Sequence, residues 1–418
     1  MRVQFVPFPA PSHLSLVVPL AWAFQNAGHD VRVVVPPNAV ELVTTTGLVA
    51  IPYGEPVDLG LPIAEMTWLS QISGLDGDGF HRDEELRKLF LAPMVMHYGA
   101  DMLKETMTEL IEITRSWQAD LVVWDTMATY AAVVARVAGA ASARLLWSLD
   151  HLGRMRAAFR ERKARDGVED SIEILTKSWL EPHGKTFDES AVLGDWTISP
   201  VPILGAGSTG MPCVTVRQFA FSHVHEAPPP WVLEPLSRPR VCLTLGRSVR
   251  DVRDSDNYGI RVEDLFEAVT DLDLDVVATL TSDQLPENVK VPDNVRLVDY
   301  VPINLLMSTC SAVIHHSGGT TMMAAFWHQV PQVIIPPNAS GDAYLTQVTA
   351  DEGAALVIPA AELTPGKLRT ALMRVLDEPS FAEAARRIRA GTLSLPTPND
   401  AIPILERLTT EAIEAQRA

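Results

Sequence analysis

Cysteine is scarce in this sequence. Only three of the 418 residues are cysteines, Cys213, Cys242 and Cys310. Their spacing matches no zinc-binding pattern and supplies no disulfide framework of the kind that staples small secreted domains. A disulfide-rich scaffold is therefore excluded, and we expect the protein to work in a reducing cytoplasm.

Long apolar runs and basic stretches are missing as well. No apolar run reaches the roughly 18 residues of a membrane span. The run at residues 2–7 has the length of a strand, and prolines break it too early for a signal peptide. Acidic residues outnumber basic ones, 52 to 34, for a formal net charge of −18. Since no basic stripe offsets this charge, it argues against general affinity for nucleic acid or an anionic membrane, and we interpret it as an aid to solubility.

The sequence contains instead a repeated alternation of strands and helices. Hydrophobic residues make up 47% of the chain, ample for a sizeable core. The first half opens with a strand at 2–7, a helix that runs to about Ala27 and a strand at 30–35. A strand at 120–125 and a helix at 128–137 follow. Strand, helix and strand joined by short links predict a right-handed unit of a parallel sheet.

A proline-rich stretch separates this half from a second one of the same kind. Three consecutive prolines at 228–230, followed by Pro235 and Pro239, predict a semi-rigid linker. Beyond it, strand patterns recur at 241–245, 274–280, 295–298, 312–315, 332–335 and 355–358, with helices such as 262–271 and 364–377 between them. We therefore predict an α/β protein of two doubly wound, Rossmann-like domains that face a central cleft.

The composition also suggests domain bounds. We expect a first domain at 1–222, a linker at 223–240 and a second domain at 241–400. The remaining residues, 401–418, predict a helix that packs back on the first domain.

The stretch from 313 to 322 is the most informative part of the chain. Residues 312–314 predict a buried strand, and residues 320–328 predict a helix with Ala324 and Phe326 inward. Histidines, a serine and glycines fill the turn between them. The first amides of a helix have no partner inside the helix, and glycine lets a ligand approach the backbone closely. The segment therefore predicts an anion site, and its natural ligand is a diphosphate.

The candidate functional residues all lie just past the end of a predicted strand. They are His13, Asp125, Gly246, Tyr300, His316 and Asp342. Ligands of doubly wound sheets bind outside the carboxyl ends of the strands, so this shared position predicts a ligand site.

Two less regular regions, 60–115 and 148–190, are rich in methionine and aromatic residues. Examples are Met66, Trp68, Phe80, Phe90, Met94, Met96, Tyr98, Met102, Met155 and Phe159. They fit either the core of ordinary amphipathic helices or a deformable apolar pocket for a bulky ligand.

Several segments, in this order along nearly the whole chain, resemble a known family. They are Ser12-His13 with 18–24 and 27–29, then 123–125, 143–147, 241–246, 294–302, 315–321 and 330–332. In these segments the chain resembles the nucleotide-sugar-dependent glycosyltransferases of the GT-B fold. It is similar in particular to the bacterial enzymes that attach deoxysugars to macrolide and aromatic polyketide antibiotics.

This resemblance implies a reaction and a division of labour. A deoxysugar, aminodeoxysugars included, would pass with inversion from a dTDP-sugar to a hydroxyl or ring carbon of an apolar polyketide acceptor. The first domain would bind the acceptor and the second the nucleotide sugar, with neither metal nor another cofactor. His13 would be the general base, because histidine titrates near neutrality. Asp125 would orient it, although each residue could instead serve only the structure of its loop.

The resemblance also assigns the donor site. The diphosphate would be held by His316, Ser317, Gly318, Gly319, Thr320 and Thr321 and approached by Gly246, Arg247 and Ser248. His316 would offset the charge of the leaving group, together with the helix dipole. Tyr300 would stack on the base and Val301 would bond to it through its backbone. Asp342 would bind sugar hydroxyls. Ala343 replaces a Gln frequent in enzymes for fully hydroxylated sugars, which favours a deoxysugar donor.

Besides Ser12, which stands where the family more often has Gly, three positions depart from the family's pattern. The family usually has Gly at the places of Ser317 and Thr320, and often Trp at that of Tyr300. These departures bear on individual contacts rather than on the existence of the site. Arg247 fits a solvent-facing position as well as a phosphate contact.

Other functions and partners stay open at this point. A catalytically silent GT-B homologue acting as a binding partner would be expected to lose the base or the diphosphate loop, and a sugar-nucleotide epimerase would need more acids around the sugar. The resemblance further implies a cytochrome-like activator protein, docking within residues 55–115. The sequence does not decide the oligomeric state, a homodimer included.

Overall fold

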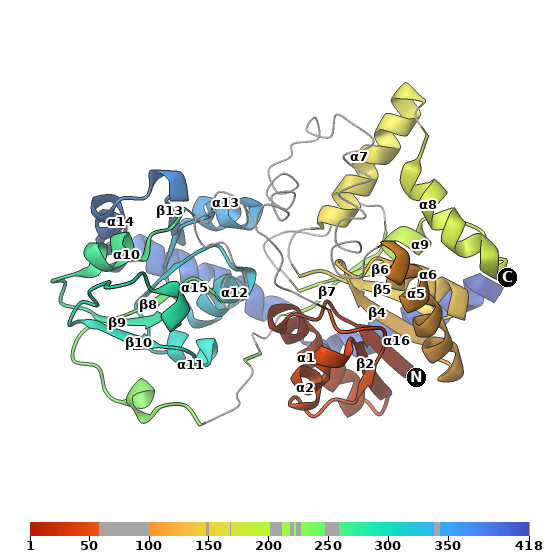
Figure 1. Cartoon of the computed structure of the whole chain (residues 1–418), viewed down its shortest axis with the longest axis horizontal. Coiled ribbons are helices and arrows are strands. Elements are labelled where there is room, and N and C mark those ends of the chain that lie inside the picture. The colour runs from red at the N-terminus through yellow and green to blue at the C-terminus, as the bar shows by residue number, and fades with distance from the viewer. Residues whose placement is uncertain are drawn as a thin grey trace. The chain divides into compact units, whose positions relative to one another are not determined.

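The chain folds into two compact units, each built on a parallel sheet (Figure 1). The computed structural model describes residues 1–57, 100–147, 150–167, 169–200, 211–217, 221–222, 227–246, 259–337 and 343–417. The described residues of the first unit fall within Met1–Leu59, Leu75–Phe219 and Leu395–Ala418, and those of the second within Ala220–Ser394.

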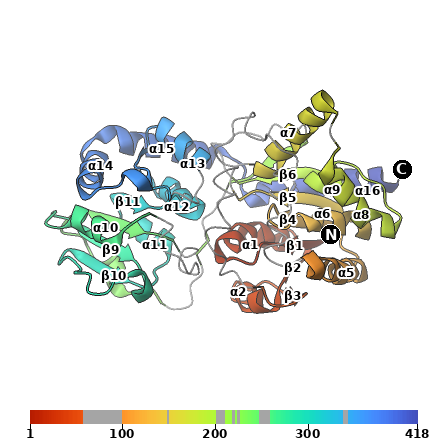
Figure 2. The same cartoon turned by 45° about the horizontal axis from the view of Figure 1, so that its top comes forward.

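The sheet of the first unit is parallel throughout. Its strands are β1 (Arg2–Val6), β2 (Asp30–Val35), β3 (Ala50–Pro52), β4 (Leu121–Asp125), β5 (Ala141–Leu145), β6 (Trp196–Ser199) and β7 (Cys213–Thr215). They lie in the order β3-β2-β1-β4-β5-β6-β7, and Figure 2 shows β1 to β6 side by side in this order. Val3 pairs with Val31 on one side and with Leu121 on the other. The strands β1, β2, β4, β5 and β6 are buried along almost their whole length because both faces of such a sheet are covered.

Helices cover both faces of this sheet. They are α1 (Pro11–Asn26), α2 (Val40–Thr44), α5 (Ala100–Ser116), α6 (Tyr130–Ala138), α7 (His151–Asp166), α8 (Ser171–Leu180), α9 (Ser190–Leu193) and α16 (Pro398–Arg417). On one face Phe24 of α1 meets Phe5 edge to face, with ring centroids 6.1 Å apart. On the other, α5, α6, α8 and α9 share a core with Trp124 and Val122. The C-terminal α16 packs on α1 and β5, and Glu406 lies 2.9 Å from the Nε2 atom of His29.

The second unit repeats the same sheet order. Its strands are β8 (Arg240–Thr244), β9 (Asp275–Thr279), β10 (Val295–Val298), β11 (Ala312–His315), β12 (Gln332–Ile334) and β13 (Ala355–Val357). They lie in the order β10-β9-β8-β11-β12-β13, again parallel. The helices are α10 (Val262–Val269), α11 (Ile303–Met307), α12 (Gly319–His328), α13 (Ala343–Asp351), α14 (Pro365–Asp377) and α15 (Pro379–Ser394). Short 3₁₀ turns occur in both units. They lie at Pro37–Ala39 and Glu181–His183 in the first unit and at Pro230–Leu233, Ser282–Gln284 and Ala360–Glu362 in the second.

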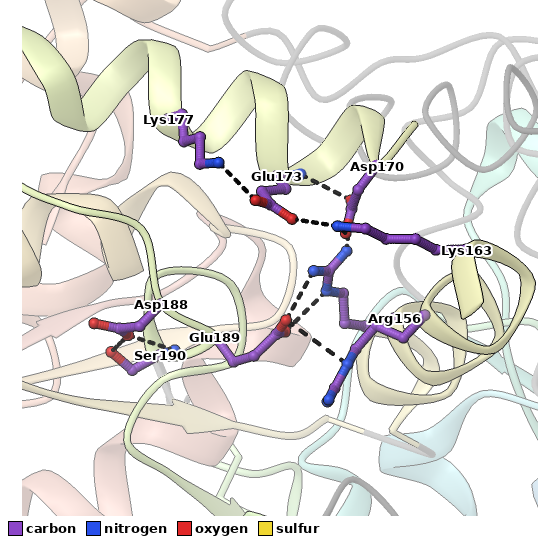
Figure 3. A network of polar contacts seen from close by, with 9 residues as sticks. Arg156, Lys163, Asp170, Glu173, Lys177, Asp188, Glu189 and Ser190 are labelled. Carbon is purple, nitrogen blue, oxygen red and sulfur yellow. Dashed lines mark hydrogen bonds and ion pairs between the residues drawn. The ribbon is translucent and has the colours of Figure 1, made fainter. Parts of the chain in front are cut away.

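A buried ion network fixes the helices that follow β5 (Figure 3). The Arg156 guanidinium, on α7, donates to Glu189 (2.9 and 2.8 Å) and to Asp170 (2.8 Å). Lys163 adds an ion pair to Glu173 on α8. Burial alone would lower the pKa of Arg156, but its hydrogen bonds to Glu189 and Asp170 hold that pKa above its ordinary value. The network ties α7 to α8 and to the segment before α9.

The predicted fold class is confirmed as two parallel sheets flanked by helices. The strands at 30–35 and 295–298 have the predicted bounds. Met155 and Phe159 lie in the core of the first unit, so the pocket interpretation is wrong for these two. The other methionine and aromatic side chains of that proposal lie outside the described residues. No helix in the described parts of the chain is long and apolar enough to cross a membrane.

Candidate functional site

The strand order reverses once in each sheet, and it does so at equivalent positions. In the first sheet the order reverses between β1 and β4, and in the second between β8 and β11. Ligands of doubly wound sheets bind beyond the carboxyl ends of the strands at such a switch point. His13 follows β1 and Asp125 ends β4, whereas Gly246 follows β8 and His316 follows β11. Four predicted site residues therefore occupy the two switch points.

His13 and Asp125 form a hydrogen-bonded pair. The Nδ1 atom of His13 lies 2.7 Å from Oδ2 of Asp125. The other oxygen of Asp125 accepts the backbone N–H of Met127 at 2.8 Å. An ionised carboxylate can only accept, so Nδ1 carries the proton and Nε2 is the basic nitrogen of the ring. The pair has the geometry of a base and the acid that orients it.

Two aromatic rings flank the imidazole of His13. Phe8 meets it edge to face with centroids 4.9 Å apart, and Trp147 lies 5.3 Å away at 50°. The His13 side chain is 15% exposed and that of Asp125 3%. The rings limit rotation of the imidazole while part of it stays accessible. Sequence reasoning missed both rings, although the position of Trp147 directly after the strand 141–145 is a signal of the kind used for the other site residues.

A rigid helix start carries His13. Helix α1 begins at Pro11, whose ring fixes the first helical φ angle, and His13 lies in the first turn. The backbone N–H of His13 donates to Ala10 C=O at 3.1 Å. Regular structure on both sides of the short loop therefore defines the position of the imidazole.

In the second unit, the turn from β11 into α12 exposes helix amides. Gly318 is the N-cap residue of α12, and no side chain caps the helix. The first bond within the helix runs from Met322 N–H to Gly318 C=O at 3.0 Å. The earlier amides, at 319–321, therefore point out of the helix end, where the dipole favours an anion. This is the geometry that the sequence predicted for the segment.

The imidazole of His316 lies between two glycines. A Cβ atom on Gly246 would overlap its Cε1 atom, and one on Gly318 would lie 2.9 Å from the same atom. Gly246 also has a φ angle of +74°, and its N–H donates to Thr244 Oγ1 at 3.2 Å. The sequence suggested that glycine serves close approach of a ligand. The structure adds that Gly246 and Gly318 make room for His316.

Both neighbouring histidines are neutral at neutral pH. Burial lowers the pKa of His316 to about 4, although a hydrogen bond with the backbone of Thr244 raises it. Burial also lowers the pKa of His315 to about 3. His315 bonds Gln332 through Nε2 and accepts the N–H of Ser317 at Nδ1, so it is a structural residue of the loop. A neutral imidazole carries one N–H group, and the hydrogen bond with the Thr244 backbone uses that group in His316, so the partial positive charge at this turn comes from the helix end.

The remaining predicted residues divide into two groups. Tyr300, beyond the end of β10, is 36% exposed, and the neighbouring Val301 is buried. Arg247, Ser248 and Asp342 lie outside the described residues. Among the parts of the chain that the structure describes, no cluster of His, Cys, Asp or Glu could hold a metal ion.

Family models match most of the chain. The N-terminal domain of "Erythromycin biosynthesis protein CIII-like" proteins matches residues 22–246, and their C-terminal domain matches residues 263–408.

Individual relatives match end to end. The chain is 38% identical to an aclacinomycin-T 2-deoxy-L-fucose transferase of Streptomyces galilaeus, over 98% of this chain and 97% of the relative. It is also 38% identical to a 10-deoxymethynolide desosaminyltransferase of Streptomyces venezuelae, over 98% of each. Among solved structures, the glycosyltransferase VinC in complex with dTDP superposes with a TM-score of 0.85 at 34% identity, over 98% of this chain and 100% of that one. The spinosyn forosaminyltransferase SpnP gives 0.81 at 35% identity, over 98% and 99%.

Proposed function

The chain belongs to the family of erythromycin biosynthesis protein CIII-like glycosyltransferases and has their GT-B fold, and we propose that it moves a deoxysugar from a dTDP-sugar to a polyketide-type aglycone in antibiotic biosynthesis. The names of its relatives support this substrate class, since they describe transferases of deoxysugars such as 2-deoxy-L-fucose and desosamine. The dTDP in the complex of VinC supports the nucleotide.

In the proposed mechanism, His13 is the general base. Its Nε2 atom takes the proton of the acceptor hydroxyl while that oxygen attacks the anomeric carbon of the sugar. The bond between this carbon and the diphosphate oxygen breaks on the opposite side, so the configuration inverts and dTDP leaves. Asp125, bonded to Nδ1 at 2.7 Å, stabilises the imidazolium that forms.

The leaving diphosphate is held, in this proposal, by the start of α12. The amides of 319–321 and the hydroxyls of Thr320 and Thr321 donate to its oxygens. His316 adds a second ring N–H once the negative charge of the diphosphate favours its doubly protonated form. Gly246, Arg247 and Ser248 approach it from the loop after β8. These donors supply the charge stabilisation that a divalent cation supplies elsewhere, so we propose transfer without metal.

The remaining donor and partner assignments are also proposals. Tyr300 stacks on the thymine, Val301 bonds it through its backbone, and Asp342 binds sugar hydroxyls. A cytochrome-like activator stays a prediction, and most of its expected docking segment, 55–115, lies outside the described residues.

One observation carries the proposal: a hydrogen-bonded His–Asp pair lies at the switch point of one sheet, and an uncapped helix start lies at the equivalent switch point of the other. Calorimetric titration with dTDP and UDP in EDTA tests the donor half. We expect micromolar dTDP binding, much weaker UDP binding and no effect of the chelator. Absence of binding to either nucleotide would overturn the donor assignment and favour the silent-homologue reading.

A further inference from the structure

The backbone of Ser317 is unusual. Its φ angle is +76°, in the left-handed region that glycine adopts freely and other residues avoid. Among the described residues other than glycine with such an angle, only Ser317 is buried. A buried residue stays in this conformation only where its surroundings hold it, and such residues gather at functional sites. The family usually has glycine here, so this chain has exchanged backbone freedom for a side chain.

A chain of buried hydrogen bonds holds Ser317. Its N–H donates to Nδ1 of His315 at 3.2 Å, so the His315 proton lies on Nε2. That Nε2–H in turn donates to the Gln332 side-chain oxygen at 2.8 Å. The Ser317 hydroxyl lies 2.7 Å from the Thr346 hydroxyl. All four residues are at most 3% exposed.

These hydrogen bonds join three elements to the turn before α12. Gln332 belongs to β12, His315 ends β11 and Thr346 lies on α13. The same face of α13 meets α12, where the Thr349 hydroxyl lies 3.9 Å from the Met322 sulfur. Ser317 stands directly between His316 and the N-cap of α12, so its position sets the direction of the first helix amides.

We propose that Ser317 and Thr346 are positioning residues of the donor site: their hydroxyl pair locks the turn before α12 to α13 and thereby aims His316 and the helix amides at the diphosphate. This inference rests on the proposed function, because it takes the ligand of the turn to be dTDP. The hydroxyl pair does here what a glycine alone cannot, since glycine adopts the turn without being tied to α13.

Four variants of the full-length chain test the pair by calorimetric titration with dTDP. Thr346→Val removes one hydroxyl at constant shape, Ser317→Ala removes the other, and the double variant removes both. Each single variant should weaken dTDP binding about five- to tenfold, the effect of one buried hydrogen bond. The double variant should bind no more weakly than the weaker single one, because the two groups act as a unit. Thr346→Ser keeps the hydroxyl and should bind dTDP within about twofold of the wild type.

Thermal unfolding of the same variants separates positioning from stability. A lower melting temperature with unchanged dTDP affinity would overturn the inference, and so would losses that add in the double variant. If Ser317→Ala fails to fold, Ser317→Gly removes the hydroxyl without strain and should show the same loss of affinity. If the wild type itself does not bind dTDP, the proposed function fails, and this inference fails with it. Normal wild-type binding with unaffected variants rejects the inference alone.

Discussion

His13 and Asp125 are 112 residues apart in the chain, yet their side chains meet at 2.7 Å. The contact exists because β1 and β4 are neighbours in the sheet: Asp125 ends β4, and His13 lies in the first turn of α1, which follows β1. The second sheet brings Gly246 and His316 together in the same way, from β8 and β11. The same parallel pairing of strands thus brings together the residues of both candidate sites.

Replacing the acid of the first pair should slow catalysis without loss of nucleotide binding. Asp125→Asn can no longer stabilise an imidazolium, so we expect kcat to fall about a thousandfold with the Kd for dTDP unchanged. Steady-state transfer and calorimetry measure the two quantities. Asp120→Asn, just before the start of β4, is the matched control and should keep normal kcat. Activity of Asp125→Asn within fivefold of the wild type would contradict the role.

A side chain at Gly246 should displace His316. Gly246→Ala places a Cβ on the imidazole, so we expect dTDP affinity to fall at least tenfold, estimated as about 1.4 kcal/mol or more. Gly353→Ala is the control: its φ is +80°, and its Cβ would meet only Ala384 at an ordinary 3.7 Å. Both variants should lose about 1 kcal/mol of stability from the left-handed backbone. Equal dTDP affinity of the two variants would show that the clash with His316 is harmless.

Stability should fall on acidification because of the two buried histidines. Their pKa values in the folded state, about 3 for His315 and about 4 for His316, lie below the ordinary 6.5. As pH falls below 6.5, the unfolded chain takes up protons that the folded chain does not, so the free energy of unfolding drops until about pH 3, by a few kcal/mol in order of magnitude. Urea unfolding at several pH values measures this slope. His316→Gln should flatten it, whereas replacement of the exposed His183 by Gln should not. A slope unchanged in His316→Gln would rule out this residue as a source.

Removing the cation of the network in Figure 3 should cost stability but not nucleotide binding. Arg156→Met removes the short ion pairs of Asp170 and Glu189 and leaves each with only a cation 3.8 Å away, Lys163 and Arg160 respectively. Breaking such a buried pair costs about 3 to 5 kcal/mol. Arg165→Met removes an exposed pair with Asp166, which water and salt screen, and should leave the stability close to that of the wild type. Chemical denaturation compares the two. A loss below about 1 kcal/mol for Arg156→Met would mean that the network is not structural support.

Local patterns were enough to predict the sheets and the position of His13, Asp125, Gly246 and His316 at or beyond strand ends. The strand at 30–35 and the helix after His316 follow from the pattern of neighbouring residues. The rule that ligands bind where the strand order reverses then draws attention to His13 and Asp125. The ring of Trp147 beside His13, the Ser317–Thr346 pair and the Arg156 network escaped prediction. Each depends on a contact between elements distant in sequence, and such contacts exist only after packing. The sequence showed that Ser317 stands where the family usually has Gly. It did not show that Ser317 has a left-handed backbone held by its hydroxyl.

The most direct test of the account is sugar transfer by His13→Ala. The assay follows dTDP release and glycosylated aglycone with a dTDP-deoxysugar and a polyketide acceptor, and calorimetry measures dTDP binding by the same preparation. We expect kcat to fall roughly a thousandfold or more with unchanged dTDP affinity, because the variant lacks the base but keeps the diphosphate site. Full activity of His13→Ala would contradict the assignment of the base on which the mechanism depends.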